Sequence, residues 1–216
     1  DSIMLIVAPG CCGRNTSLIS SMPEYNDRFF YLMMDETDIV TGRHLKKIPK
    51  AVKEICDCCE KKPSVVMICI TCVDALLGTD MERVCRKAEE KVDIPVRPCY
   101  MYALTREGRK PPMVHVRQSL YSLLEPQKKK GNVVNLLGFF SQLVDDCGLY
   151  ELLHQAEVKT VHEISRCRDY EEYQTMSQAN FNLVLHPEAR FAAEDFHDRL
   201  KIPFIELRRL YQVDKI

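Results

Sequence analysis

The sequence predicts an α/β fold of Rossmann-like or flavodoxin-like βαβ domains with mainly parallel sheets. Short apolar and β-branched runs alternate with stretches of helical periodicity along the 216 residues, which is the pattern of parallel strands joined by crossover helices. This length accommodates one large or two small domains. Residues 125–131 are polar and charged and contain Pro126 and Gly131, as is typical of a linker. We therefore expect a first α/β domain over residues 1–127 and a second over residues 131–216.

The first domain is expected to contain three strands and three helices. The strands are apolar runs at residues 3–8, 64–70 and 95–99. The helices are indicated by apolar residues at helical spacing in residues 45–59, 81–88 and 113–124. Thr79 and Glu82 have the spacing of a capping box at the start of the second helix. The chain between the first strand and the first helix is expected to be irregular.

The second domain is expected to repeat this alternation. Its strands are predicted at residues 133–137, 182–185 and 203–207. Its helices are predicted at residues 149–156, 170–179 and 187–200. Gly138 follows the first of these strands in the manner of a βα turn.

The composition disfavours binding to polyanions and to membranes. The 30 Lys and Arg residues and 31 Asp and Glu residues give a formal net charge of -1, so no overall field draws the protein to nucleic acid or to an acidic membrane. No apolar run approaches the roughly 20 residues that span a bilayer, and the start of the chain lacks the charged region of a signal peptide. We expect a cytoplasmic protein that is not exported.

Eleven cysteines suggest a role for thiols in the reduced state. The number is odd and several of these cysteines lie inside apolar or helical patterns, which disfavours a disulfide framework. Reduced thiols in a cytosolic or anaerobic setting fit better. The sequence contains neither a G-x-G-x-x-G nor a Walker phosphate loop, so a nucleotide site of either type is not expected.

Four cysteines lie at or near the carboxyl ends of predicted strands. Cys11 and Cys12 follow the first strand, Cys72 follows the second and Cys99 ends the third. Ligands of open parallel sheets gather at these ends, and thiolates from different turns can together hold an iron–sulfur cluster. Cys11 and Cys12 could equally be small residues that fit a turn.

The remaining cysteines are interpreted mainly as structural. Cys69 forms the only C-x-x-C pair, with Cys72, but it lies within a strand pattern and is expected to be a core residue. A metal site is one reading for three thiols near one helix end, but ordinary helix positions explain them more simply; they are Cys56, Cys58 and Cys59. Three further thiols are expected to be structural, namely Cys85, Cys147 and Cys167.

One histidine stands out from the rest. His186 directly follows the strand predicted at residues 182–185, at an end where ligands gather. It is a candidate ligand, and capping of the next helix is the alternative. No mutual spacing assembles the other histidines into a site, so each is expected to be solvated or locally bonded; they are His44, His115, His154, His162 and His197.

Several segments in order resemble one family, the component 1 proteins of nitrogenase and its relatives in chlorophyll, cofactor F430 and sulfur metabolism. Residues 65–80 (VVMICITCVDALLGTD) are similar to the family's strand, Thr-Cys and Ile-Gly-Asp-Asp element. Residues 34–42 resemble its loop ending in Gly before a Lys-rich helix, and residues 8–12 occupy the place of its Pro-containing turn. Residues 134–138, 179–184 and 201–204 resemble parts of its second domain.

The resemblance implies an iron–sulfur cluster, [4Fe-4S] or larger, that is shared between subunits. It implies Cys72 and Cys12 as cluster ligands, with Cys11 as a substitute because the family's His-Gly is missing from the turn; Thr71 and Gly78 belong to the same matched element. It also implies an iron-protein-like ATPase and, as second subunit, another copy or a paralogous component 1 protein. His186 is near the position of the cysteine that anchors the cofactor in the nitrogenase α subunit, so standard binding of a molybdenum–iron cofactor is not expected.

Three functions remain open from the sequence. The first is an oxidoreductase fragment whose cluster relays electrons from the ATP-dependent iron protein to a substrate site. The second is a scaffold for metallocofactor assembly, and the third is a cluster-free domain that keeps only the fold. Family members carry a further upstream cluster cysteine and a third domain, and both are expected to lie outside this chain.

Overall fold

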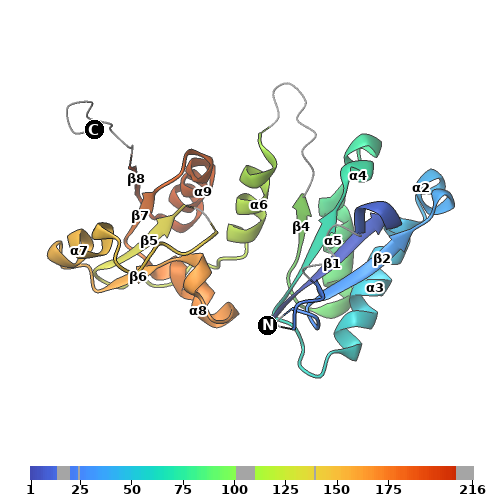
Figure 1. Ribbon diagram of the computed structural model, residues 1–216, viewed down its shortest axis with the longest axis horizontal. Helices are drawn as coiled ribbons and strands as arrows, with labels where there is room; N and C mark the ends of the chain where they lie inside the picture. Colours follow the sequence, from blue (N-terminus) through green and yellow to red (C-terminus); the bar gives the residue numbers. More distant parts are fainter. Residues whose placement is uncertain (14–19, 24, 101–109, 139, 208–216) are drawn as a thin grey trace. The chain divides into compact units, whose positions relative to one another are not determined.

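The computed structural model describes residues 1–13, 20–23, 25–100, 110–138 and 140–207. The chain forms two compact units, Asp1–Leu120 and Tyr121–Ile216. Each unit contains a sheet of four parallel strands with helices between them (Figure 1). The predicted α/β fold with parallel sheets is therefore confirmed.

The first unit has the strand order β2-β1-β3-β4. Its strands are β1 (Ser2–Pro9), β2 (Phe29–Met34), β3 (Val65–Ile70) and β4 (Val96–Tyr100). Its helices are α2 (Glu36–Thr41), α3 (His44–Cys58), α4 (Cys72–Leu77), α5 (Met81–Val92) and α6 (Pro112–Tyr121), whose last residue opens the second unit. In the described part, α3 and α5 pack together on one face of this sheet (Figure 1).

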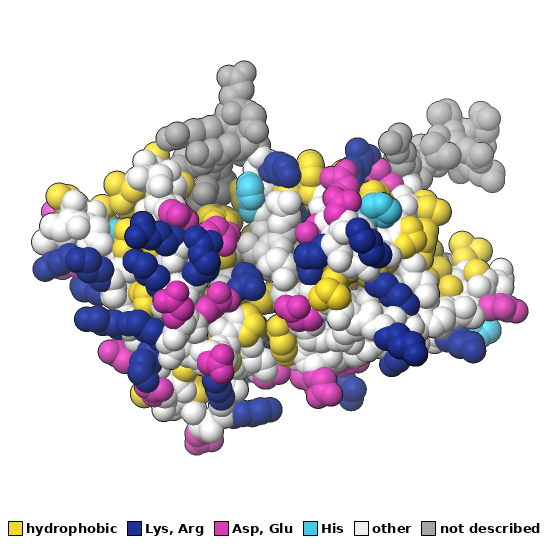
Figure 2. All heavy atoms as spheres, turned by 180° about the vertical axis from the view of Figure 1, so that it is seen from behind, with side chains coloured by type: hydrophobic (Ala, Val, Ile, Leu, Met, Phe, Trp, Pro, Cys, Tyr) yellow, Lys and Arg dark blue, Asp and Glu magenta, His cyan; other side chains and the backbone are white. Residues whose placement is uncertain are grey.

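Strand alternation explains how the first core forms. Leu5 and Val7 of β1 and Ile68 of β3 point to the face covered by α3 and α5, where they meet Ile48 and Met81. All six residues of β3 are buried, as expected for a central parallel strand covered on both faces. The outer surface of this unit carries Lys and Arg interspersed with Asp and Glu (Figure 2), in agreement with the near-zero net charge.

The second unit has the equivalent strand order, β6-β5-β7-β8. Its strands are β5 (Val133–Leu137), β6 (Thr160–His162), β7 (Phe181–Val184) and β8 (Phe204–Glu206). Its helices are α7 (Gly148–Gln155), α8 (Tyr170–Gln174), α9 (Arg190–Leu200) and the 3-10 turns η1 (Ile164–Arg166), η2 (Thr175–Gln178) and η3 (Pro187–Ala189).

The second unit has its own core on the two faces of its sheet. Val134, Leu136 and Leu183 form one cluster with Leu153 of α7. On α9, Phe196 is fully buried, and its ring lies edge-on to that of Tyr121 at 5.0 Å between centroids. No helix in the described part of the chain has the length and apolar character needed to cross a membrane.

The segment predicted as a linker belongs to the second unit. The backbone N–H of Glu125 donates to Gln174 Oε1 at 3.0 Å, and Lys129 Nζ donates to the Ser177 carbonyl at 2.7 Å. Arg199 donates to the Tyr121 carbonyl at 2.9 Å. The division between the compact units therefore falls before this segment, after Leu120.

Four elements were not anticipated, and one predicted cap is wrong. The strands β2 and β6 and the short helices α2 and α4 are additions to the predicted order. α5 is capped by Asp80, whose carboxylate accepts from the Arg83 N–H at 3.0 Å, and not by Thr79 with Glu82. An Asp side chain one residue nearer to the helix satisfies the same free N–H groups at the N-terminus.

Candidate functional site

The carboxyl end of the first sheet gathers the turns that follow three of its strands. β1 leads into residues 10–13, β2 into α2, and β3 into α4 (Figure 1). Gly10 and Gly13 lie close to Met33 of β2, where an added Cβ would be 3.4 and 3.6 Å from its side chain. The turn after β1 is therefore held against the neighbouring strand, and we call this end of the sheet, with Cys11, Cys12 and Cys72, the thiol edge.

Three of the four candidate ligands interact at the thiol edge. The Sγ atoms of Cys11 and Cys12 are 3.9 Å apart. Partial burial raises the pKa of Cys12, and its neighbours Cys11 and Cys72 raise the pKa further. Cys11 is exposed, and Cys12 and Cys72 are half-buried. Thiolates that repel one another near the surface are a setting in which a bound cation relieves the repulsion.

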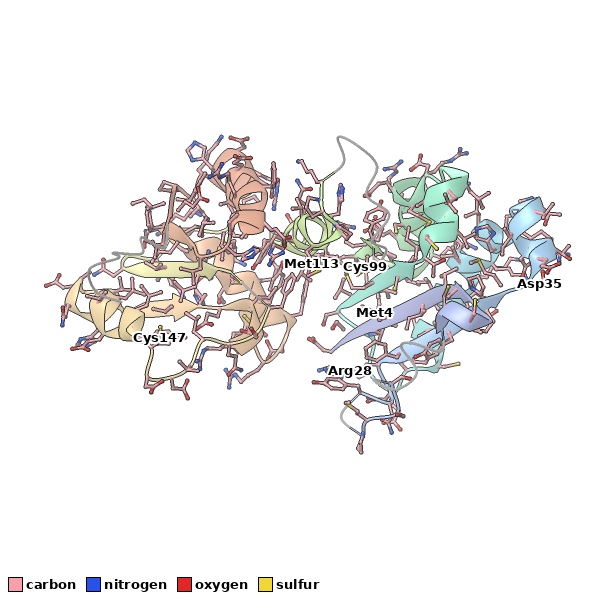
Figure 3. The ribbon with its side chains drawn as sticks, turned by 45° about the horizontal axis from the view of Figure 1, so that its top comes forward. Met4, Arg28, Asp35, Cys99, Met113 and Cys147 are labelled. Carbon is pink, nitrogen blue, oxygen red and sulfur yellow. The ribbon has the colours of Figure 1, made fainter. Side chains whose placement is uncertain are left out.

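The fourth candidate, Cys99, is buried within the sheet. It is paired in register with Cys69 of β3, and both thiols are nearly inaccessible. Burial raises the pKa of Cys99 to about 11 and that of Cys69 to about 12, which keeps both as neutral thiols. The structure thus does not bring Cys99 to the surface with the other three; Figure 3 shows Cys99 on the β4 side of the sheet and Asp35 on the far side, at α2.

Thr71 and Gly78 are the two ends of the helix that carries Cys72. Thr71 is the N-cap of α4, and its buried Oγ1 has no hydrogen-bond partner among the described residues. Gly78 ends α4 with φ 65°, a left-handed conformation that favours glycine. Together they fix where this six-residue helix begins and ends, with Cys72 as its first residue.

α2 and α4 are built alike. Each has six residues, each ends at a glycine with φ 65°, and each buries one side chain, the aspartate at its third position. These aspartates, Asp38 and Asp74, are 2% and 1% exposed. A buried carboxylate requires a hydrogen-bond partner, so the partner of each indicates what holds the two helices.

His44, at the start of α3, contacts both helices. Its Nδ1 is 3.0 Å from the carbonyl oxygen of Asp38, and its Nε2 is 3.1 Å from Oδ1 of Asp74. His44 is 1% exposed, so the expectation of a solvated or merely locally bonded histidine is wrong. The turn at Gly42 returns the chain from α2 into α3 and thereby brings His44 back over α2.

The carboxylate of Asp38 is directed to a different partner. Lys47 Nζ donates to its Oδ2 at 2.6 Å, and Arg43 Nε lies 3.4 Å from its Oδ1. The hydrogen bond from Lys47 is the main cause that lowers the pKa of Asp38. Asp35, the N-cap of α2, accepts from the Asp38 N–H at 2.7 Å. Asp38 is therefore tied to α3 through three of its atoms.

The sequence did contain a signal for this arrangement. The pattern cap-x-x-Asp-x-x-x-Gly occurs after two strands, from Asp35 to Gly42 and from Thr71 to Gly78. Since residues at the third helical position usually serve as local caps, neither aspartate stands out alone. The repetition of the pattern is what distinguishes them.

The other predicted thiols have separate surroundings. Burial raises the pKa of Cys85 to about 12 within the core of the first unit. Cys167 donates to the carbonyl of Glu163. Cys147 precedes α7 and lines a cavity in the second unit (Figure 3). The thiols at the end of α3 are exposed or half-buried; they are Cys56, Cys58 and Cys59.

The carboxyl end of the second sheet contains His186 and an apolar cavity. His186 is the N-cap of η3, and its Nδ1 accepts from the Glu188 N–H at 3.3 Å, which is the capping geometry named as an alternative. The cavity, of about 300 Å³, is lined mainly by apolar side chains from the strand ends and from the residues before α7, including Leu136, Leu185 and Leu207. Its polar lining includes Glu163, which is occupied by the Leu143 N–H and by Arg166.

The thiol edge has the donor type of an iron–sulfur site but not a closed ligand set. Thiolates are the usual ligands of such clusters, and three thiols interact here. In the described part of the chain, however, no group of three or more His, Cys, Asp or Glu side chains is arranged to hold a metal ion. The residues present therefore fit one side of a cluster that takes further ligands from elsewhere.

Comparison with known proteins gives consistent relatives. The nitrogenase iron-molybdenum cofactor biosynthesis protein NifE of Nostoc sp. is 27% identical over 99% of this chain and 45% of its own length. NifE of Mesorhizobium japonicum is 31% identical over 65% of this chain and 29% of its own length. NifE of Sinorhizobium fredii is 34% identical over 45% of this chain and 20% of its own length. The chain thus spans less than half the length of these relatives.

Solved structures agree with this at the level of the fold. A chain of "Nitrogenase Cp1 at pH 6.5" matches with a TM-score of 0.68 and 18% identity, covering 99% of this chain and 51% of that one. "Nitrogenase Cp1 at pH 5" matches with a TM-score of 0.65 and 20% identity, covering 95% and 44%. A sequence model described as "Nitrogenase component 1 type Oxidoreductase" matches residues 1–216. This chain therefore belongs to the nitrogenase component 1 type oxidoreductase family.

Proposed function

We propose that this chain is the front part of a scaffold for metallocofactor assembly that holds an iron–sulfur cluster at its thiol edge. The observation that carries the proposal is the interaction of Cys11, Cys12 and Cys72, which come from turns after two different strands. The relatives described above, which are named as cofactor biosynthesis proteins, favour a scaffold over the other functions of the family.

In this proposal Cys12 and Cys72 are ligands, and Cys11 is the neighbour that can replace Cys12. Thiolates stabilise a cluster, while their surroundings set its potential. The incomplete ligand set supports a cluster shared with a second subunit, either another copy or a paralogous component 1 protein. The thiol edge suits such sharing because Cys11 is exposed and Cys12 and Cys72 are half-buried.

A second candidate function is electron relay, in which the cluster passes electrons from an iron-protein-like ATPase to a substrate site. The family match favours it, since the family is described as an oxidoreductase type. The two functions differ in turnover. A scaffold retains its cluster under reduction without forming product, whereas a relay reduces a substrate only when the ATPase and ATP are present.

The cluster is tested by iron, sulfide and zinc content and by the visible spectrum of anaerobically reconstituted full chain. Wild type is expected to contain iron and sulfide and to show broad charge-transfer absorption. Cys12→Ala and Cys72→Ala are expected to lose most of both, because each removes one thiolate ligand. Cys58→Ala is the matched control, since it removes an exposed thiol at the far end of α3.

The outcomes separate the three functions. Iron that is lost in the Cys12 and Cys72 variants and kept in the Cys58 variant supports the thiol edge as the binding site. Colourless, iron-free wild type, or zinc in place of iron, contradicts the proposal and favours a domain that keeps only the fold. Iron lost equally in all three variants contradicts the assignment of ligands.

A further inference from the structure

The two short helices at the thiol edge are held to the unit mainly by polar contacts. α2 and α4 each have one fully buried side chain, Asp38 and Asp74. Their apolar residues contribute little, since Val40 is 85% exposed and Leu76 is 64% exposed. Helices of six residues are not stable in isolation. Their position therefore depends on what the buried aspartates and the adjacent backbone contact.

Both helices depend on the same imidazole. The carbonyl oxygen of Asp38 can only accept a hydrogen bond, so Nδ1 of His44 donates to it. An ionised carboxylate also only accepts, so Nε2 donates to Asp74. His44 thus uses its two N–H groups to join the backbone of α2 to the side chain of α4.

We propose that His44 is a positioning residue for Cys72: by fastening α4 to α2 and α3 through Asp74, it holds the Cys72 thiol at the thiol edge. Cys72 is the first residue of α4 and Asp74 is the third, so the contact lies within the same helical turn as the thiol. The use of this position for a cluster rests on the proposed function.

No other described contact fixes α4 as directly. Thr71 makes no side-chain cap, and the second carboxylate oxygen of Asp74 has no hydrogen-bond partner in the described part of the chain. The backbone contributes the bond from the Thr79 N–H to the carbonyl of Asp74 at 3.0 Å, which closes the helix but does not attach it elsewhere. Removal of His44 therefore leaves the carboxylate of Asp74 buried and without this donor.

The test is the rate of alkylation of each cysteine by iodoacetamide in the full chain, without iron, read by peptide mass spectrometry. His44→Leu is expected to raise the rate at Cys72 about tenfold, because α4 is released locally. Cys69 and Cys85, buried in the sheet and the core, are expected to stay protected. His44→Gln keeps an N–H donor and is expected to return Cys72 to within about threefold of wild type.

Lys53→Gln is the matched control on the same helix. Lys53 donates to Asp57 on the exposed face of α3 at 2.7 Å, so its loss is expected to leave Cys72 unchanged. An unchanged Cys72 rate in His44→Leu overturns the proposal. Equal increases at Cys69, Cys72 and Cys85 also overturn it, since they indicate loss of the whole unit. Because no iron is present, failure to bind a cluster in the earlier experiment leaves this result independent.

Discussion

The two units have the same strand order but different carboxyl ends. In both, the first strand lies between the second and third, and the fourth is outermost. At the first sheet, this end holds thiols and an imidazole that bridges two carboxyl-bearing helices. At the second, it holds a largely apolar cavity and the capping His186. Shared topology thus places a crevice in each unit, and the local residues decide its chemistry.

Their buried polar groups differ in the same way. The first unit buries charged or chargeable groups beside the strand ends, namely Asp38, His44 and Asp74. The second buries the amides of Asn135 and Asn182 in the sheet itself, where Asn135 Nδ2 donates to Asn182 Oδ1 at 2.8 Å. An amide pair keeps adjacent strands in register without a net charge, whereas the first arrangement joins separate helices. The comparison suggests a structural role for the pair in the second unit and a role in the site for His44.

The largest expected effect tests whether the units have separate cores. Phe196→Ala is expected to destabilise the second unit by about 3–5 kcal/mol, because it empties a fully buried position beside Tyr121. Ile48→Ala is the counterpart in the first core, at about 2–5 kcal/mol. Amide hydrogen exchange resolved by peptide is expected to accelerate in β5 and β7 for the first variant and in β1 and β3 for the second.

Exchange that accelerates equally in both sheets for either variant would show that the units unfold together. In that case the comparison of two separate crevices would describe one cooperative domain.

The next effect addresses the amide pair. Asn135→Leu or Asn182→Leu alone is expected to cost about 1–3 kcal/mol, because each leaves the other amide buried without its partner. The double variant is expected to cost less than the sum, measured by denaturant unfolding. The Met176 carbonyl, to which Asn135 also donates, keeps the Ala179 N–H as a donor at 3.3 Å. Additive costs would indicate that the pair does not act as a unit.

The sequence was sufficient for the fold because apolar periodicity reports burial directly. The runs at β1, β3, β5 and β7 are central strands that are buried through much of their length. The edge strand β2 was missed because its residues are mostly half-buried, and β6 because it has three residues. Short or one-sided elements carry too little periodicity to be recognised.

The candidate site was only partly predictable for a related reason. Strand ends locate Cys11, Cys12 and Cys72, because parallel topology brings such ends together. Cys99 occupies a similar place in the sequence, yet it lies in register with Cys69 inside the sheet. Which face a strand residue occupies depends on register, and the contact between His44 and Asp74 joins residues 30 apart. Neither follows from the spacing of residue types alone.

The smallest expected effect distinguishes the glycines of the two units. Gly78→Ala is expected to cost about 1 kcal/mol, because φ 65° disfavours a side chain, although no atom lies within 4 Å of the added Cβ. Gly148→Ala, at the first position of α7 and also without close neighbours, is expected to stabilise by about 0.4–1 kcal/mol. Thermal or denaturant unfolding measures both. If Gly78→Ala were neutral, the left-handed end of α4 would not constrain the helix, and the fixed position of Cys72 would depend on the contact between His44 and Asp74 alone.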